Sequence, residues 1–152
     1  MDNRALARVL HEIADALEIK GEGFFRVRSY RLAAESIEAS DLDVAGLVAR
    51  GKKVDLPGIG EGITARLAEI VRDGSSAFHR ELFDEVPRGL LELLTLPGLA
   101  HKSVRRLWTE LGVRSLDELE QAIDDGRFLA LPGMKGKKAA ALKRALAERR
   151  RR

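Results

Sequence analysis

Three short loops combine proline and glycine in the same order, and a backbone of this kind can bind an anion. The loops read LPGIG at residues 56–60, LPGLA at 96–100 and LPGMK at 131–135, and we refer to them as hairpin loops 1, 2 and 3. A helix that starts directly after such a turn leaves its first amides unpaired, and these amides together with the helix dipole favour a negative charge. Glycine lets a ligand approach the backbone closely and tolerates positive φ. We therefore expect the amides of residues 58–62 and 98–103 to contact phosphate groups.

The three copies keep the same helical register but differ at their final position. A leucine follows seven residues after the last loop residue in every copy, which places Leu67, Leu107 and Leu142 on inward faces of the following helices. Loop 1 ends in glycine, whereas loops 2 and 3 end in Ala100 and Lys135. Loops 2 and 3 therefore either bind phosphate less tightly than loop 1 or serve only in packing.

Apolar residues recur at three- and four-residue spacing through most of the chain, and no run alternates as a strand does. This pattern predicts an all-α fold. The expected helices cover residues 3–19, 24–39, 43–50, 61–73, 76–84, 88–95, 101–111, 115–125 and 136–150. We expect Asn3 and Ser115 to cap the helices at whose starts they lie, and Trp108 to lie in the core.

Composition excludes several classes of function. The chain has 152 residues, of which 45% are hydrophobic and none is cysteine, so it can bury a core but has no disulfide or thiolate zinc site. The three histidines are too scattered to suggest a metal cluster. The first helix is amphipathic rather than an export signal, and charges interrupt every apolar stretch. We expect a cytoplasmic protein, nucleoid-associated if prokaryotic, with no membrane span.

The positive charge is concentrated near the C-terminus. The net charge is +3, but residues 131–152 carry +8 and the rest of the chain carries −5. The run of four arginines at 149–152 forms a basic tail that would add nonspecific affinity for a polyanion, although such an end is usually frayed.

The hairpin loops resemble the helix-hairpin-helix motif, in which an apolar residue, proline, glycine, a second apolar residue and glycine precede a helix. Loop 1 matches at every position. Residues 3–50, especially FRVRSYRLAA at 25–34, look like the opening helices of the small lyase domain of family X DNA polymerases, and 92–125 look like the helical segment that follows it. The resemblance implies two parts: 1–86, a lyase-like helical domain with loop 1, and 87–152, a second helical lobe with loops 2 and 3 and the basic tail. No strand carries paired aspartates for two Mg²⁺ ions, so we expect no polymerase activity from the chain by itself.

The resemblance implies sequence-nonspecific DNA binding through backbone phosphates, at nicks, gaps or ends in DNA repair. Arg26, Tyr30 and Arg31 fall where the family holds the 5′-phosphate of a gapped or nicked strand, and Tyr30 could hydrogen-bond that phosphate or stack on a base. The residues expected at DNA are Gly58, Ile59, Gly60, Glu61, Gly62, Arg66, Arg26, Tyr30, Arg31, Gly98, Leu99, Ala100, Lys102, Arg105, Gly133, Lys135, Lys137 and Lys138.

The resemblance also implies one structural monovalent cation, Na⁺ or K⁺, and no other cofactor. Backbone carbonyls would hold such an ion. They belong to Val54, Leu56 and Ile59 around loop 1 and to Leu94, Leu96 and Leu99 around loop 2.

We expect no catalytic residue. In the family, a lysine amine on the helix after the first hairpin forms a Schiff base with an abasic sugar, but Arg66 stands there and stays protonated. A second family lysine is replaced by Gly62, and Lys52 and Lys53, just before loop 1, lack its positioning. Two alternatives stay open: a residual abasic-site lyase and a protein docking module in a repair complex. The expected partners are nicked DNA, gapped DNA or a single-strand/duplex junction, together with a repair polymerase, nuclease or ligase.

Overall fold

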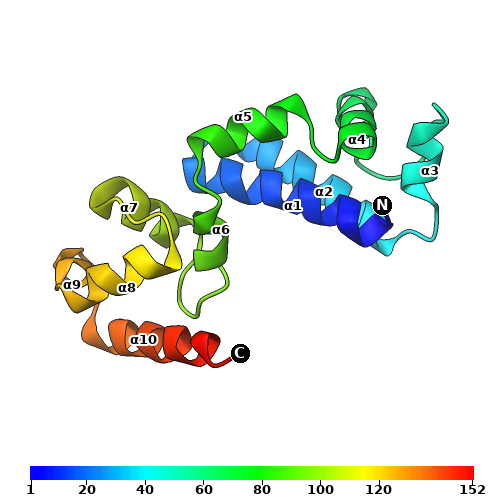
Figure 1. Ribbon diagram of the computed structural model, residues 1–152. Coiled ribbons are helices and arrows are strands. Elements are labelled where there is room, and N and C mark those ends of the chain that lie inside the picture. Colours follow the sequence, from blue (N-terminus) through cyan, green and yellow to red (C-terminus); the bar gives the residue numbers. More distant parts are fainter. The chain divides into compact units, whose positions relative to one another are not determined.

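A computed structural model describes all 152 residues as ten helices without strands, which confirms the all-α prediction (Figure 1). The helices are α1 (Asn3–Lys20), α2 (Phe24–Ala39), α3 (Val44–Ala49), α4 (Glu61–Asp73), α5 (Ala77–Glu85), α6 (Gly89–Leu93), α7 (His101–Leu111), α8 (Leu116–Asp124), α9 (Arg127–Ala130) and α10 (Gly136–Arg150). The chain divides into two compact units, Met1–Glu85 and Val86–Arg152. None of the helices is both long and apolar enough to span a membrane.

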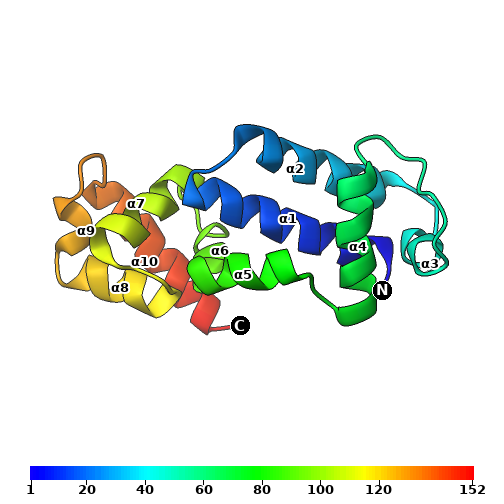
Figure 2. The same cartoon turned by 90° about the horizontal axis from the view of Figure 1, so that it is seen from above.

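The first unit is built around the pair α1 and α2, which run side by side (Figures 1 and 2). Leu6, Leu10, Ile13 and Leu17 recur along α1 at three- and four-residue spacing and are fully or almost fully buried. Helix α5 packs on α1 as well. The short connection from α1 to α2 is possible because Gly21 ends α1 in the left-handed conformation, φ 81°.

The N-cap of α1 differs from the prediction. Asp2, not Asn3, is the cap, and its carboxylate accepts a hydrogen bond from the Ala5 amide at 2.8 Å. Asn3 is the first helical residue, and its side-chain amide donates to the carbonyls of Ser40 and Leu42. Aspartate and asparagine are both common N-cap residues, so the sequence alone does not show which of the two caps the helix. In the structure, Asn3 instead holds the segment between α2 and α3, and this leaves Asp2 as the cap.

Loop 1 and α4 are anchored on α2 and on the small helix α3. The Ser36 hydroxyl of α2 donates to the Pro57 carbonyl of loop 1 at 2.5 Å. Leu67 and Ile70 of α4 are fully buried, as the register of the hairpin predicted for Leu67. Figure 2 shows α4 lying across the direction of α1 and α2.

The second unit is a cluster of five helices with Phe128, Leu107 and Leu142 fully buried. Ser115 caps α8 as predicted, with its hydroxyl accepting from the Glu118 amide at 3.1 Å. Two features differ from the predictions. Helix α9 was not expected, because four residues are too few to establish a helical period, and Trp108 is only half-buried rather than in the core.

Candidate nucleic-acid interface

The three hairpin loops adopt the same backbone turn. In each, the amide of the fourth residue donates to the carbonyl of the first, at 3.2 Å in loop 1, 3.4 Å in loop 2 and 3.1 Å in loop 3. The central glycines Gly58, Gly98 and Gly133 have φ of 79°, 77° and 83°, which disfavours any other residue. Gly58 is further restricted because a Cβ there would lie 2.8 Å from Leu32 Cγ. The sequence repeat is therefore a structural repeat.

The final position of the loops is different, because none of the three residues there needs glycine's conformational freedom. Gly60, Ala100 and Lys135 have φ of −97°, −121° and −102° with extended ψ. A Cβ at Gly60 would meet no atom within 4 Å. Ala100 and Lys135 therefore leave the turn undistorted. A side chain at this position instead changes how accessible the helix N-terminus is to a ligand, and it changes the charge near that N-terminus.

The helices that follow the loops begin without a side-chain cap. In α4, α7 and α10 the cap residue donates or accepts no side-chain hydrogen bond. Of the helices that follow other connections, α1, α3 and α8 are capped by an aspartate or serine oxygen, whereas α2, α6 and α9 have no side-chain cap. Uncapped first-turn amides retain their capacity to bind an anion. The Glu61 and Gly62 amides at the start of α4 are of this kind, and both residues are exposed.

A shallow pocket of about 300 Å³ lies between the first turns of α2 and of α4. Its lining residues are Phe25, Arg26, Ser29, Tyr30, Gly62, Ile63 and Arg66. The pocket therefore brings together four residues that the sequence analysis expected at DNA: Arg26, Tyr30, Gly62 and Arg66. Neither Arg26 nor Arg66 forms an ion pair, so two positive charges at this pocket have no carboxylate partner.

Phe78 of α5 positions both arginines. The guanidinium carbons of Arg26 and Arg66 lie 4.7 and 4.8 Å from the centroid of the Phe78 ring. The Tyr30 ring stacks parallel to Phe78 with centroids 6.1 Å apart, and the Tyr30 hydroxyl accepts a hydrogen bond from Arg66 Nε at 3.3 Å. Because Tyr30 is only 6% exposed, its ring is not accessible for stacking on a base. That part of the prediction was wrong, and Tyr30 instead orients Arg66.

Arg31 lies away from this pocket. Its guanidinium contacts carboxylates of α1, with Nη2 2.5 Å from Asp15 Oδ1 and 3.3 Å from Glu18 Oε1. It lines a separate groove on the other side of α2. Arg31 therefore joins α2 to α1 by ion pairs and does not share the pocket of Arg26.

In the second unit, loops 2 and 3 are neighbours. Arg106 of α7 donates to the Pro132 carbonyl of loop 3 at 2.7 Å, and a Cβ at Gly98 of loop 2 would lie 3.4 Å from Lys138 Cε of α10. The basic residues expected at DNA surround this pair of loops: Lys102 and Arg105 on α7, Lys135 at the start of α10, and Lys137 and Lys138 in its first turn. Lys102, Arg105, Lys135 and Lys137 are exposed, and Lys138 is half-exposed. Leu99 is buried, so only its backbone faces the loop surface.

The basic tail is partly neutralised by α8. Helix α10 continues through Arg150, whose guanidinium hydrogen-bonds Glu120, and Arg149 hydrogen-bonds the Thr95 hydroxyl. The hydrogen bond from Arg150 lowers the pKa of Glu120 below its ordinary value, assisted by the charges of Arg150 and of Lys143. Arg149 and Arg150 therefore each have a hydrogen-bond partner within the second unit.

The carbonyls suggested for a monovalent cation have suitable chemistry, since they are neutral oxygens with lone pairs to spare. The Leu56 and Leu96 carbonyls each accept one turn hydrogen bond, from Ile59 and Leu99 respectively. No group of three or more histidine, aspartate or glutamate side chains could hold a metal ion.

Comparison with known proteins agrees with this geometry. The helix-hairpin-helix domain model matches residues 1–76, half of the chain. The chain belongs to the helix-hairpin-helix domain family. It is also 33% identical over 148 residues to the DNA polymerase/3′-5′ exonuclease PolX of Bacillus subtilis, covering 97% of this chain and 25% of the relative. A DNA nucleotidylexotransferase of Ambystoma mexicanum is 33% identical over 114 residues, which are 70% of this chain and 21% of that enzyme.

The helix-hairpin-helix chain thus spans about a quarter of the length of the curated relatives that it matches. Both matches agree with the resemblance to the helical region of family X polymerases.

Sequence reasoning missed two contributors to the helix-hairpin-helix site. Phe78 lies on α5, 12 residues after Arg66, and no spacing rule connects it with α2. Phe25 lies within the stretch that carries the family resemblance, yet it was given no role. Its 80% exposure could be known only from the folded structure. The sequence signal that could have suggested contact with nucleic acid is a pair of phenylalanines followed directly by arginine.

Proposed function

We propose that the chain binds DNA without reading its sequence, at nicks, gaps or single-strand/duplex junctions, by holding a 5′-phosphate in the pocket of Arg26 and Arg66. The observation that carries the proposal is the convergence of two guanidiniums without carboxylate partners on one pocket, beside the uncapped start of α4. A terminal phosphate carries more charge than an internal one, and guanidiniums bind it through paired hydrogen bonds. The pocket therefore suits a strand end better than continuous duplex.

Loops 2 and 3 supply a second contact with the DNA backbone in this proposal. Their adjacency places two uncapped helix starts, α7 and α10, in one region with five basic side chains around them. Contacts of this type fix the protein on the duplex and carry no sequence information. Ala100 and Lys135 are compatible with this role because they leave the turn intact, and Lys135 adds a charge where loop 1 has none.

The proposed role is non-enzymatic. The position of the family's nucleophilic lysine is held by Arg66, whose guanidinium cannot form a Schiff base, and Arg66 donates to Tyr30 rather than facing a general base. The chain would act as a binding module beside a repair polymerase, nuclease or ligase. The loop carbonyls of Leu56 and Leu96 would hold Na⁺ or K⁺ against a bound phosphate.

The test is fluorescence anisotropy with gapped, nicked, single-stranded and continuous duplex DNA. Each broken substrate is made with a 5′-phosphate and with a 5′-hydroxyl, and binding is measured at two salt concentrations. The wild-type protein is compared with Arg66→Gln and with Arg72→Gln, a matched control on the same helix whose side chain pairs with Asp73.

The proposal expects tighter binding of the 5′-phosphate forms, a steep loss of affinity with salt, and loss of the 5′-phosphate preference in Arg66→Gln only. Equal affinity for phosphate and hydroxyl ends would reject the pocket. Affinity that does not change with salt would reject backbone binding altogether and favour a protein docking module.

A further inference from the structure

Two adjacent aromatic side chains at the start of α2 are almost fully exposed. Phe24 is 72% exposed and Phe25 is 80% exposed, and their rings meet edge to face with centroids 5.6 Å apart. Both follow Gly23, whose φ of 54° starts the helix from a left-handed residue. Two adjacent rings exposed to water form a candidate contact surface for a ligand.

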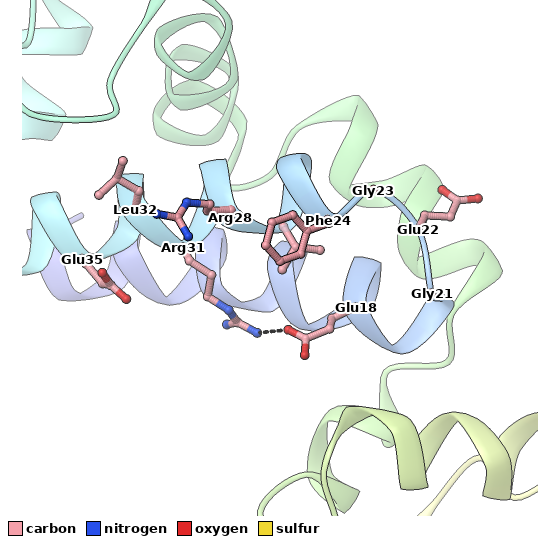
Figure 3. A pocket seen from close by; sticks show the side chains of 10 residues that line it. Glu18, Gly21, Glu22, Gly23, Phe24, Arg28, Arg31, Leu32 and Glu35 are labelled. Atoms are coloured by element: carbon pink, nitrogen blue, oxygen red, sulfur yellow. Dashed lines mark hydrogen bonds and ion pairs between the residues drawn. The ribbon is translucent and has the colours of Figure 1, made fainter.

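The two rings border different hollows. Phe25 lines the pocket of Arg26 and Arg66, whereas Phe24 lines a larger groove of about 580 Å³ on the other side of α2. Figure 3 shows this groove between α2 and the C-terminal part of α1, with Phe24, Arg28 and Leu32 following one another along α2. The pair Phe24–Phe25 is thus the ridge between the proposed phosphate pocket and the groove.

The groove side of α2 leads from this ridge to hairpin loop 1. Phe24, Arg28 and Leu32 are four residues apart and therefore lie on one face of the helix. All three are exposed, and Leu32 lies against Gly58 of the loop. One exposed strip therefore carries an aromatic ring, a guanidinium and an apolar side chain, and ends at the loop.

The groove is lined by two arginines and three glutamates, and most of these charges are paired. Glu18 pairs with Arg31, and Glu22 pairs with Lys20. Arg28 forms no ion pair, in contrast to Arg31, which α1 holds. Glu35, on α2 itself, places a carboxylate at the groove where amino groups of a base could donate to it. Stacking on a ring with an arginine nearby is the usual way of binding single-stranded nucleic acid.

We propose that the groove binds an unpaired nucleobase of the strand whose 5′-phosphate lies in the pocket of Arg26 and Arg66, with Phe24 stacking on the base and Arg28 contacting the next phosphate. The inference rests on the proposed function. The strand would leave the phosphate pocket, cross the Phe24–Phe25 ridge, and contact Phe24 and Arg28 in the groove. The ligand is thus a 5′-phosphorylated single-stranded segment, as at a 5′ flap.

The test is photo-crosslinking with an oligonucleotide that carries 5-iododeoxyuridine at its second nucleotide, made with a 5′-phosphate and with a 5′-hydroxyl. Crosslinked peptides are sequenced by mass spectrometry, and affinity is measured in parallel by anisotropy. The variants are Phe24→Ala, Phe24→Leu and Arg28→Gln. Leu42→Ala serves as a matched control, because Leu42 is an exposed apolar residue of the same unit.

The inference expects a crosslink at Phe24 and a loss of affinity of about 5- to 150-fold in Phe24→Ala, the range of one base–aromatic stack. Phe24→Leu should lose as much, because leucine keeps the apolar surface without the ring. The preference for a 5′-phosphate should stay as in wild type in both variants.

Each of the other outcomes has one meaning. Wild-type affinity in Phe24→Ala, or full affinity in Phe24→Leu, would overturn the base site and leave the phosphate pocket standing. A crosslink at Phe24 with both the phosphate and the hydroxyl probe, bound equally well, would support the base site and reject the phosphate pocket. A crosslink at Phe25 alone would overturn the assignment to the groove.

Discussion

The substitution Gly60→Glu separates backbone binding by hairpin loop 1 from the folding of the loop. Position 60 has φ −97° and ψ −171°, which every residue adopts, and a Cβ there has open space around it. A carboxylate at the start of α4 also interacts favourably with the helix dipole. The variant should therefore fold with an unchanged thermal midpoint. Gly58→Glu is the contrasting case, because positive φ and the 2.8 Å approach to Leu32 should destabilise the loop itself.

The effect of Gly60→Glu on binding follows from charge and access. A carboxylate about 4 Å from a phosphate is repelled by about 1 kcal/mol in water and by about 4 kcal/mol at an effective dielectric constant of 20. The position is exposed, so the repulsion should be near the lower value. Displacing one charge-assisted amide contact adds about 1.5 kcal/mol. The total of about 2–3 kcal/mol corresponds to roughly 30- to 150-fold weaker binding.

Anisotropy titration of a gapped duplex measures this change, and circular dichroism melting checks the fold. Ala68→Glu is the matched control, since it adds the same charge at an exposed site further along α4. It should cost less than threefold if the effect is local, by the weak screened repulsion between exposed charges. A folded Gly60→Glu protein that binds as tightly as wild type would refute the claim that the start of α4 contacts phosphate.

Three further predictions concern the chemistry and stability of the fold. Arg66→Lys should allow borohydride trapping on an abasic site, because the nearby positive charge of Arg26 favours a neutral amine, whereas wild type should give no trapping. Glu120 should stabilise the second unit fully above its ordinary pKa of 4.5 and lose this effect as pH falls through the lowered folded value, so thermal melts of Glu120→Gln should change less between pH 6 and 3. Leu142→Ala should lower the free energy of unfolding by about 2–5 kcal/mol in urea titrations, and exposed Lys137→Ala by less than about 0.5 kcal/mol.

Local signals made most of the fold predictable. The proline–glycine loops and the leucines seven residues later fix where helices start and which face is buried, and Leu67, Leu107 and Leu142 are indeed fully buried. Helix α9 escaped prediction because four residues do not define a period. The local sequence did not show whether Asp2 or Asn3 caps α1.

The site was predictable only in part. Arg26 and Arg66 are 40 residues apart, and only the family resemblance joined them in advance. The separation of Arg31 from Arg26 depends on the packing of α1 against α2, and the burial of Tyr30 depends on Phe78 of α5. Neither contact can be recognised in the sequence, because each joins two helices that meet only in the folded structure.

Because α4, α7 and α10 have no side-chain caps, the stability of the protein should depend on whether an anion is bound at their first amides. A side-chain cap contributes about 1 kcal/mol to a helix, and these three helices begin without one. An anion at the same amides would supply the absent hydrogen bonds, and a ligand that binds only the folded state raises the free energy of unfolding with the logarithm of its concentration. The chain should therefore resist heat and proteolysis better on its target than in free solution, so that the free form is turned over first.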